Sequence, residues 1–392
     1  MTHLPPLCLT GARILTDGAL QPGALSLADG LLTDQGGVAV DLSGYLVLPG
    51  IIDLHGDGFE RHMAPRPTAP FPITAGLSSY AREAAASGVT TAYLAQGWSW
   101  EGGHRSPDHA EVMMEAVADF TRHALCDLRV QLRAETYLVD QADRLLAAAE
   151  RFGLGYVVFN DHIEEAIKMR RMQPEMFGIW ARKAGQTGQD LSRRIDAARA
   201  HARAVPRSLC HLAQGFERLG VITGSHDDPD AETRDFYAMM GARIAEFPTT
   251  RKAAAAARSM GDPVLMGAPN VVRGGSQSGN IAASALVSEG LCDALVSDYH
   301  LPALPLAAWT LVDDRLCGLA EAWAMISTNP ARILRLSDRG RIAVGLRADL
   351  VIVNAQTRAI EATISAGRLA FMAGAVAGRF LGTGHGLGLA AE

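Results

Sequence analysis

The sequence contains very little lysine. Only three of its 36 basic residues are lysines, at positions 168, 183 and 252, and the other 33 are arginines. With 42 acidic residues the net charge is −6, which gives no general electrostatic reason to bind nucleic acid or an anionic membrane. An anion site in this chain must therefore be built mainly from arginine, whose planar guanidinium suits phosphate.

Paired cysteines and long apolar runs are also missing. The five cysteines, at positions 8, 126, 210, 292 and 317, are scattered and form no CxxC pair, which argues against a disulfide framework or a zinc ribbon. No uncharged apolar run approaches the roughly 18 residues that span a bilayer. The first residues do not show a basic segment followed by an apolar one. We therefore expect a cytoplasmic protein with no membrane partner.

The middle of the chain alternates short apolar runs with helical stretches, as successive βα units do. The 392 residues are enough for one large barrel or two ordinary domains. Polar or glycine-rich residues follow each run, where the carboxyl ends of barrel strands carry catalytic groups. The pattern predicts an α/β fold, a TIM-type (β/α)8 barrel, with eight strands at 47–54, 90–95, 129–134, 156–160, 220–224, 243–247, 263–267 and 294–297.

Both flanks of this region resemble short strands joined by turns. The pattern predicts one small β-sandwich-like domain formed from both chain ends, residues 1–48 and 339–380. The barrel is predicted at 49–338. The polar segment 164–208, with six arginines between positions 170 and 199, predicts a helical insertion after the fourth strand. Residues 381–392 are expected to be a loose tail.

The first predicted strand ends in His55 and Asp57, within the sequence LPGIIDLHGD. Residues two apart in an extended chain point the same way, so both side chains can reach one ion. A lone histidine at a strand end is more often a hydrogen-bonded core residue. The carboxylate beside it and the barrel context favour a metal ligand.

Two more histidines end predicted strands, His162 after the fourth and His226 after the fifth. Each alone could be structural, but strand ends of a barrel converge on one rim, so three together favour a metal site. Histidines with carboxylates suit one or two zinc ions, and manganese or nickel where more oxygen ligands join.

Two carboxylates complete the predicted site. Asp298 ends the eighth run and is expected to bind metal and to act as the catalytic base toward a metal-bound water, whose pKa falls to about 7. The alternative, a helix N-cap, is weaker because Tyr-His-Leu-Pro follows. Glu135 ends the third run and is the candidate for an anion bridging two metals; the alternative is an ion pair with a nearby arginine. A carboxylated lysine is not expected, because no lysine ends a predicted strand.

The seventh loop, GAPNVVRGGSQSGN, combines an arginine with glycines, hydroxyls and an amide before a helix expected near position 280. Such a loop is often only a loop. In a barrel, however, phosphate commonly binds after the seventh and eighth strands and at helix N-termini. The predicted phosphate-binding residues are Arg273, Gly274, Gly275, Ser276, Ser278 and Asn280, with Arg66, Thr249 and Thr250 as further contacts.

Several of these segments carry a family resemblance. LPGIIDLH, the strand-end ligands and the stretch RADL at 347–350 resemble the amidohydrolase superfamily. More narrowly, HGDGFERHMAPRP, SHDD, EFPTT, GAPNVVRGGSQSGN and SDY resemble the alpha-D-ribose 1-methylphosphonate 5-triphosphate diphosphatase family of the carbon–phosphorus lyase pathway of phosphonate degradation. The resemblance extends over residues 46–353. It departs from the family at Gly56 and Gly58, where Thr and Asn are usual, and after His162.

The resemblance implies a diphosphatase, a hydrolase of phosphorus-containing anhydrides that acts on a small phosphorylated sugar. A metal-bound hydroxide would attack the α-phosphorus of a 5-triphosphate and release pyrophosphate and a 5-phosphate. The metal and base roles would fall to His55, Asp57, Glu135, His162, His226 and Asp298. A homo-oligomer is compatible with the sequence.

Two other functions remain open on these residues. One is a hydrolase on the same scaffold that cleaves a cyclic amide or deaminates a ring. The other is a catalytically silent scaffold subunit of a phosphonate-processing assembly, which would bind no metal. The intact ligand set argues against the silent subunit.

Overall fold

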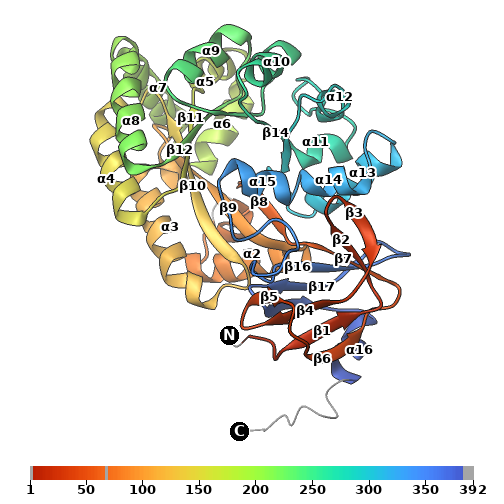
Figure 1. Ribbon diagram of the computed structural model, residues 1–392. Coiled ribbons are helices and arrows are strands. Elements are labelled where there is room, and N and C mark those ends of the chain that lie inside the picture. The colour runs from red at the N-terminus through yellow and green to blue at the C-terminus, as the bar shows by residue number, and fades with distance from the viewer. Residues whose placement is uncertain (1–2, 67–68, 383–392) are drawn as a thin grey trace.

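The computed structural model describes residues 3–66 and 69–382. Its centre is a sheet of eight parallel strands that lie side by side in chain order, with helices around the outside (Figure 1). A parallel bridge between Gly56 and Asp298 joins the first strand to the last, so the sheet closes into the predicted TIM-type barrel. The strands are β8 (Ile51–Gly56), β9 (Val89–Trp98), β10 (Asp127–Glu135), β11 (Tyr156–Asn160), β12 (Ile222–His226), β13 (Ile244–Glu246), β14 (Val264–Gly267) and β15 (Ala294–Val296).

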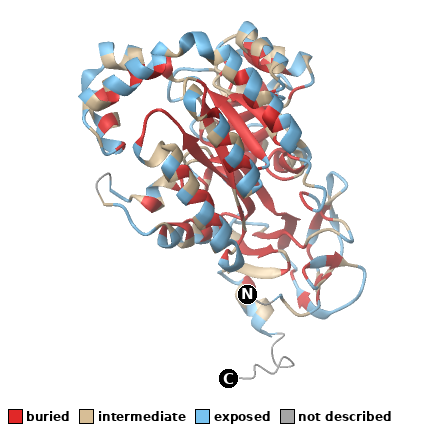
Figure 2. Ribbon diagram, turned by 90° about the vertical axis from the view of Figure 1, so that its left-hand side faces the viewer, coloured by how far each residue is buried: buried red, intermediate tan, exposed pale blue. Residues whose placement is uncertain are grey.

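The barrel strands are buried on both faces, as their continuous apolar runs require (Figure 2). Inside the barrel, Ile52, Tyr156 and Leu265 belong to one apolar cluster. On the outside, Leu132 and Phe159 pack in a larger cluster that includes residues of the surrounding helices. The strand walls are thus held from both sides, and their carboxyl ends are free to carry polar groups.

The run predicted at 47–54 is two strands in the structure. Residues Tyr45–Pro49 form β7 in a separate sheet, and β8 begins at Ile51. Gly50 marks the break. A β-carbon at Gly50 would lie 2.3 Å from Thr90 Oγ1 and 2.9 Å from the β-carbon of Asp349, so the chain passes too close to its neighbours for a side chain.

Helices connect the strands and begin and end at recognisable signals. Ser106 caps α3 (Pro107–Phe120) by accepting a hydrogen bond from the amide of His109, with Pro107 in the first turn. The helix α4 (Ala142–Phe152) ends at Gly153 in the left-handed conformation. The helices before the last sheet strands are α1 (Glu60–Met63), α2 (Ile73–Ala86), α3 (Pro107–Phe120), α4 (Ala142–Phe152), α8 (Val205–Leu219), α9 (Ala231–Met239), α10 (Arg251–Ser259), α11 (Ala268–Val272), α12 (Ala283–Ser288), α13 (Ala303–Asp313), α14 (Leu319–Ala324) and α15 (Thr328–Ile333).

Strands from both chain ends form two further sheets below the barrel (Figure 1). In the six-stranded sheet, β7 from the N-terminal part pairs antiparallel with β16 from the C-terminal part. Val47, Leu350 and Ile352 are buried in the core shared by the sheets. The elements are β1 (Leu7–Thr10), β2 (Arg13–Thr16), β3 (Ala19–Pro22), β4 (Leu25–Ala28), β5 (Leu31–Thr33), β6 (Val38–Asp41), β16 (Leu350–Asn354), β17 (Ile360–Ser365), β18 (Arg368–Met372) and α16 (Val376–Gly382).

The segment after β11 is helical, with α5 (Ile163–Met172), α6 (Pro174–Lys183) and α7 (Gly188–Ala200) preceding α8. These three helices bury a small apolar core of their own, in which Phe177 and Leu191 belong to the same cluster as Trp100 from the loop after β9. The insertion is therefore attached to the rim of the barrel.

Residues 383–392, most of the expected tail, lie outside the described residues. In the part of the chain that the structure describes, no helix is long and apolar enough to cross a membrane.

Closure of the barrel depends on a glycine and a buried carboxylate. Asp53 of β8 accepts hydrogen bonds from Ser297, at 2.9 Å from the amide and 2.5 Å from the hydroxyl. A β-carbon at Gly56 would lie 2.6 Å from Ser297 Oγ and 2.7 Å from Asp53 Oδ2. The Asp53–Ser297 pair thus fills the space that a side chain at position 56 would need.

We therefore expect Gly56→Ala to destabilise the barrel by about 1–3 kcal/mol through overpacking. The measurement is urea unfolding of chelator-treated protein, so that metal binding does not contribute. Gly155→Ala is the matched control, because a β-carbon there meets nothing within 4 Å. Equal unfolding midpoints for the two variants would contradict the expectation.

Candidate metal centre

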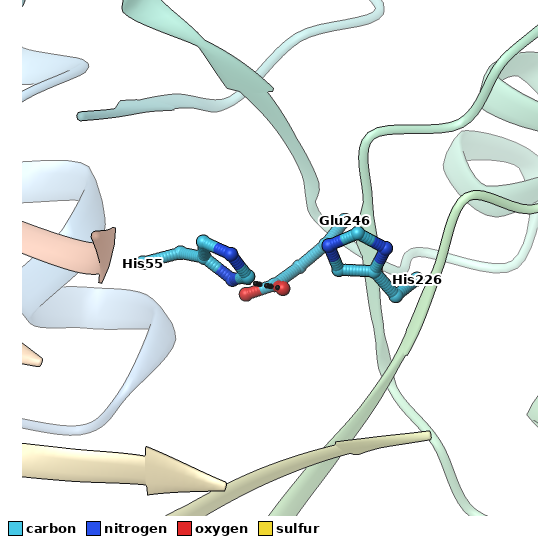
Figure 3. A group of neighbouring side chains, drawn as sticks. All are labelled: His55, His226 and Glu246. Carbon is cyan, nitrogen blue, oxygen red and sulfur yellow. Dashed lines mark hydrogen bonds and ion pairs between the residues drawn. The ribbon is translucent and has the colours of Figure 1, made fainter. Parts of the chain in front are cut away.

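Three histidines meet at the carboxyl end of the barrel. His55 is in β8, His226 ends β12, and His162 directly precedes α5. The ring centroids of His55 and His226 are 5.2 Å apart, and those of His162 and His226 are 6.2 Å apart. The structure thus brings together the three histidines that the strand-end argument singled out. Figure 3 shows two of them on either side of Glu246.

Each histidine is hydrogen-bonded through Nδ1 to a carboxylate. The distances are 2.7 Å from His55 to Glu246, 2.5 Å from His162 to Glu135, and 2.8 Å from His226 to Asp227. A carboxylate fixes the proton on Nδ1, which leaves Nε2 as the ring nitrogen with a lone pair for a metal ion. In their neutral form, all three rings would therefore have the tautomer that a metal site of imidazole ligands requires.

The three rings differ in acidity. Burial disfavours the charged ring of His55, but the Glu246 carboxylate outweighs it and raises the pKa. For His162 burial is likewise outweighed by Glu135, and the pKa rises to about 9. Burial lowers the pKa of His226 to about 4, with Asp227 opposing it only in part. His226 is thus neutral at pH 7, the form that binds metal.

Glu246, the last residue of β13, was not among the residues singled out from the sequence. It is fully buried and accepts hydrogen bonds from Gln131 at 2.7 Å and from the Tyr156 hydroxyl at 2.6 Å, besides that of His55. A signal was present, because Glu246 is the next-to-last residue of the sixth predicted strand, 243–247, in the motif EFPTT. Asp227, in SHDD, was missed as well; its φ of 60° turns the carboxylate back toward His226.

Asp57 and Asp298 are joined through the backbone. The amide of Asp298 donates to the carbonyl of His55 at 3.0 Å, and the amide of Asp57 donates to the carbonyl of Asp298 at 2.8 Å. Asp298 has a φ of 54° and lies well before α13, whose N-cap is Pro302. The alternative of a helix N-cap at Asp298 is therefore wrong.

The surroundings of Asp57 and Asp298 raise the pKa of both carboxyls. Burial, and then the charge of Asp57, raises the pKa of Asp298 to about 6. Burial, and then Glu60, raises the pKa of Asp57, although Arg133 lies 3.7 Å away. Neighbouring carboxylates that resist ionisation are stabilised by a cation between them. Their acidity therefore fits a divalent ion.

Glu135 has an imidazole partner and an indole partner. Besides His162, it accepts a hydrogen bond from Trp100 Nε1 at 3.0 Å. The neighbouring Glu101 is held in the same way, by Trp180 Nε1 of α6 at 2.6 Å. The ion pair of Glu135 is thus with a histidine, and its role as a bridging anion stays a prediction.

The donor atoms are close enough together to bind metal. Three groups of ligand atoms each lie within 4.8 Å of one another: His55, His226 and Glu246; His162, His226 and Asp227; and Glu101, Glu135 and His162. Nitrogen and carboxylate donors of this kind suit zinc, manganese or nickel. The residues present therefore fit a divalent metal ion.

The seventh loop lies beside the eighth strand. Its first part is the short helix α11, and the next helix, α12, begins at Ala283 instead of near position 280. Asn270 explains the later start, because its side chain accepts from the amide of Ala283 and donates to the carbonyl of Ile281. Arg273 reaches the hydroxyl of Tyr299 at 3.3 Å, next to Asp298.

The remaining predicted phosphate contacts are on surface loops. Gly274 has a φ of 74°, and Ser276 accepts a hydrogen bond from the amide of Ser278. Thr250 caps α10, and its hydroxyl donates to the carbonyl of Pro229 at 3.0 Å. The other members of the set are exposed or half-buried at the rim: Thr249, Gly275, Asn280 and Arg66. Phosphate binding by these residues stays a prediction.

Known proteins match the chain in sequence and in fold. The model of an amidohydrolase family matches residues 303–371. The alpha-D-ribose 1-methylphosphonate 5-triphosphate diphosphatase of Escherichia coli is 34% identical over 325 residues, which cover 81% of this chain and 85% of that protein.

Solved structures share the architecture at low identity. A β-aspartyl dipeptidase from Fervidobacterium islandicum has a TM-score of 0.59 at 16% identity, covering 94% of this chain and 97% of its own. A dihydropyrimidinase from Brevibacillus agri has a TM-score of 0.61 at 11% identity, covering 94% and 95%. An N-acetylglucosamine-6-phosphate deacetylase from Pasteurella multocida has the same TM-score and identity, covering 93% and 99%. These likenesses show the fold alone.

We expect Glu246→Gln to lower metal affinity by about 10- to 100-fold, the usual effect of removing the partner of a metal-binding histidine. Glutamine loses the charge that holds the proton on His55 Nδ1. Competition with a chromophoric chelator measures the affinity. Glu217→Gln, on the exposed face of α8, is the control. An affinity equal to that of the control would mean that Glu246 does not support the metal site.

Proposed function

The chain belongs to the amidohydrolase family, in the branch that contains the Escherichia coli diphosphatase, and we propose that it hydrolyses alpha-D-ribose 1-methylphosphonate 5-triphosphate or a close relative. The products would be the 5-phosphate and pyrophosphate, in phosphonate degradation. The observation that carries the proposal is the contact between Arg273 and Tyr299, which ties an arginine- and glycine-rich loop to the strand end that bears Asp298.

His55, Asp57, His162, His226 and Asp298 would hold the metal, with Glu135 as the candidate bridge if two ions bind. When bound, a divalent cation acidifies the attacking water and withdraws charge from the phosphoryl oxygens. Zinc suits the histidines, while manganese or nickel would use more of the carboxylates. Glu246, Glu135 and Asp227 orient the rings through Nδ1.

Asp298 would take the proton of the attacking water on its carboxylate. Burial favours the protonated form of this group, which makes the carboxylate a stronger base than an exposed aspartate. A β-carbon at Gly267 would come within 3.2 Å of Asp298 Oδ2, so the missing side chain leaves room beside the carboxylate. The backbone bonds to His55 and Asp57 hold Asp298 in place.

Arg273 would bind the outer phosphates of the substrate. Its guanidinium is exposed and has Gln277 at 3.2 Å and Tyr299 at 3.3 Å as neutral partners, so its charge is not offset by a carboxylate in these contacts. Charge-assisted hydrogen bonds from a guanidinium suit phosphate oxygens. The position next to Asp298 would direct the leaving pyrophosphate toward the rim.

Phosphorus NMR of the metal-loaded enzyme with the ribose 5-triphosphate tests the proposal. We expect the triphosphate signals to be replaced by those of pyrophosphate and a 5-phosphate. A cyclic amide and an aminated ring, assayed by ring opening and ammonia release, are the competing substrates. An unchanged phosphorus spectrum with fully metallated enzyme would reject the diphosphatase, and ammonia or ring opening would favour the other hydrolase.

Asp298→Asn is expected to reduce turnover by at least about 100-fold, the lower range for a general base. The isosteric amide cannot take the proton, while the other ligands keep metal in the site. Turnover is measured by pyrophosphate release and metal content by atomic emission. Asp314→Asn, on an exposed residue, controls for the lost charge. Activity of Asp298→Asn equal to that of Asp314→Asn would remove the base role.

A further inference from the structure

An arginine lies among the ligands at the base of the centre. Arg133 is in β10 two residues before Glu135, so both side chains point to the inside of the barrel. The side chain of Arg133 is only 13% exposed, and Nη1 lies 3.7 Å from Asp57 Oδ2. When the side-chain amide of Asn160 is turned so that its oxygen faces Arg133, that oxygen accepts hydrogen bonds from Nη2 of Arg133 at 3.1 Å and from Nε at 3.2 Å.

Arg133 lies beside candidate ligands from several strands. Its guanidinium faces Asp57, which follows the first barrel strand, and Asn160, which ends the fourth. Arg133, Glu135 and His162 also line one small cavity. Arg133 is therefore placed next to three of the candidate ligands.

The contacts of Arg133 within the protein are incomplete. A guanidinium has five N–H donors, and a buried one is stable when carboxylates or several acceptors satisfy them. Within residues 3–66 and 69–382, no carboxylate lies within hydrogen-bonding distance of Arg133, and Asp57 is the nearest recorded ion-pair partner. A metal ion on Asp57 would compete for the charge of that carboxylate. An anionic ligand at the centre would then supply the acceptors that Arg133 lacks.

We propose that Arg133 binds the oxygens of a phosphoryl group at the metal centre and so selects a phosphate anhydride over a neutral amide. This inference rests on the proposed function. It assigns to Arg133, inside the barrel, the recognition of the phosphoryl group that is attacked. Arg273 at the rim would bind the outer phosphates. The planar fork of Arg133 can donate two parallel hydrogen bonds to one phosphoryl group.

The alternative role of Arg133 is structural, as a counter-charge that holds Asp57 and Asn160. The two roles differ in ligand binding. We choose inorganic phosphate as the probe, because it resembles one phosphoryl group and chelates metal less strongly than pyrophosphate. Calorimetry with metal-loaded enzyme measures its affinity, and metal content is checked after each titration.

Arg133→Gln is expected to weaken phosphate binding by about 10- to 100-fold, the effect of losing a hydrogen bond from a charged group. Arg133→Lys, which keeps the charge but not the fork, should lose less. The matched control is Arg129→Gln, four residues earlier on the same strand, where the side chain contacts Asp127 and Tyr93 at the opposite end of the barrel. The control should bind phosphate within about twofold of the wild type.

Phosphate affinity of metal-loaded Arg133→Gln equal to the wild type would overturn the inference. If Arg133→Gln does not fold, unchanged affinity of Arg133→Lys would do so, and a wild-type enzyme that binds no phosphate would also overturn it. Arg133-dependent phosphate binding without cleavage of the triphosphate would reject the proposed function and leave the inference standing. Cleavage of the triphosphate, with phosphate binding that does not depend on Arg133, would support the proposed function and overturn the inference.

Discussion

At the join between β8 and β15, backbone hydrogen bonds connect His55 to Asp298 and Asp298 to Asp57. The Asp53–Ser297 pair lies directly below them and keeps the first and last strands together. A displacement at this join would move three candidate ligands at once. The order of the metal centre therefore depends on the closure of the barrel. A single β-carbon at Gly56 would disturb the closure and the centre together.

Around this join the site is a balance of buried charges. Five carboxylates, from Asp57, Glu135, Asp227, Glu246 and Asp298, surround three histidines and one guanidinium. Three of the carboxylates accept a hydrogen bond from a histidine ring, and burial raises the pKa of the remaining two. Such an arrangement is costly without cations. The same excess of negative charge would repel a triphosphate. If the chain hydrolyses such a substrate, a metal ion and the two arginines, Arg133 and Arg273, must together offset that charge.

The barrel was predictable because each strand is a continuous apolar run that ends in polar residues, and the comparisons and the structure confirm it. The meeting of His55, His162, His226 and Asp298 follows from the convergence of strand ends on one rim. The motif EFPTT placed Glu246 near the end of the sixth strand, but its hydrogen bond to His55 depends on the inward direction of that side chain, which the pattern does not give. Asp227 depends on a left-handed backbone, and the reach of Arg133 depends on which interior side chain is long enough to approach the rim.

The pairing of β7 with β16 has a consequence for the order in which the chain can fold. β7 leads directly into β8, the strand that carries His55, yet its antiparallel partner spans Leu350–Asn354. β7 is made early, but the edge that β16 covers stays unpaired until Leu350–Asn354 has been made. An unpaired strand edge can form non-native pairings while it waits, so β7 is the part of the N-terminal sheet most open to misfolding.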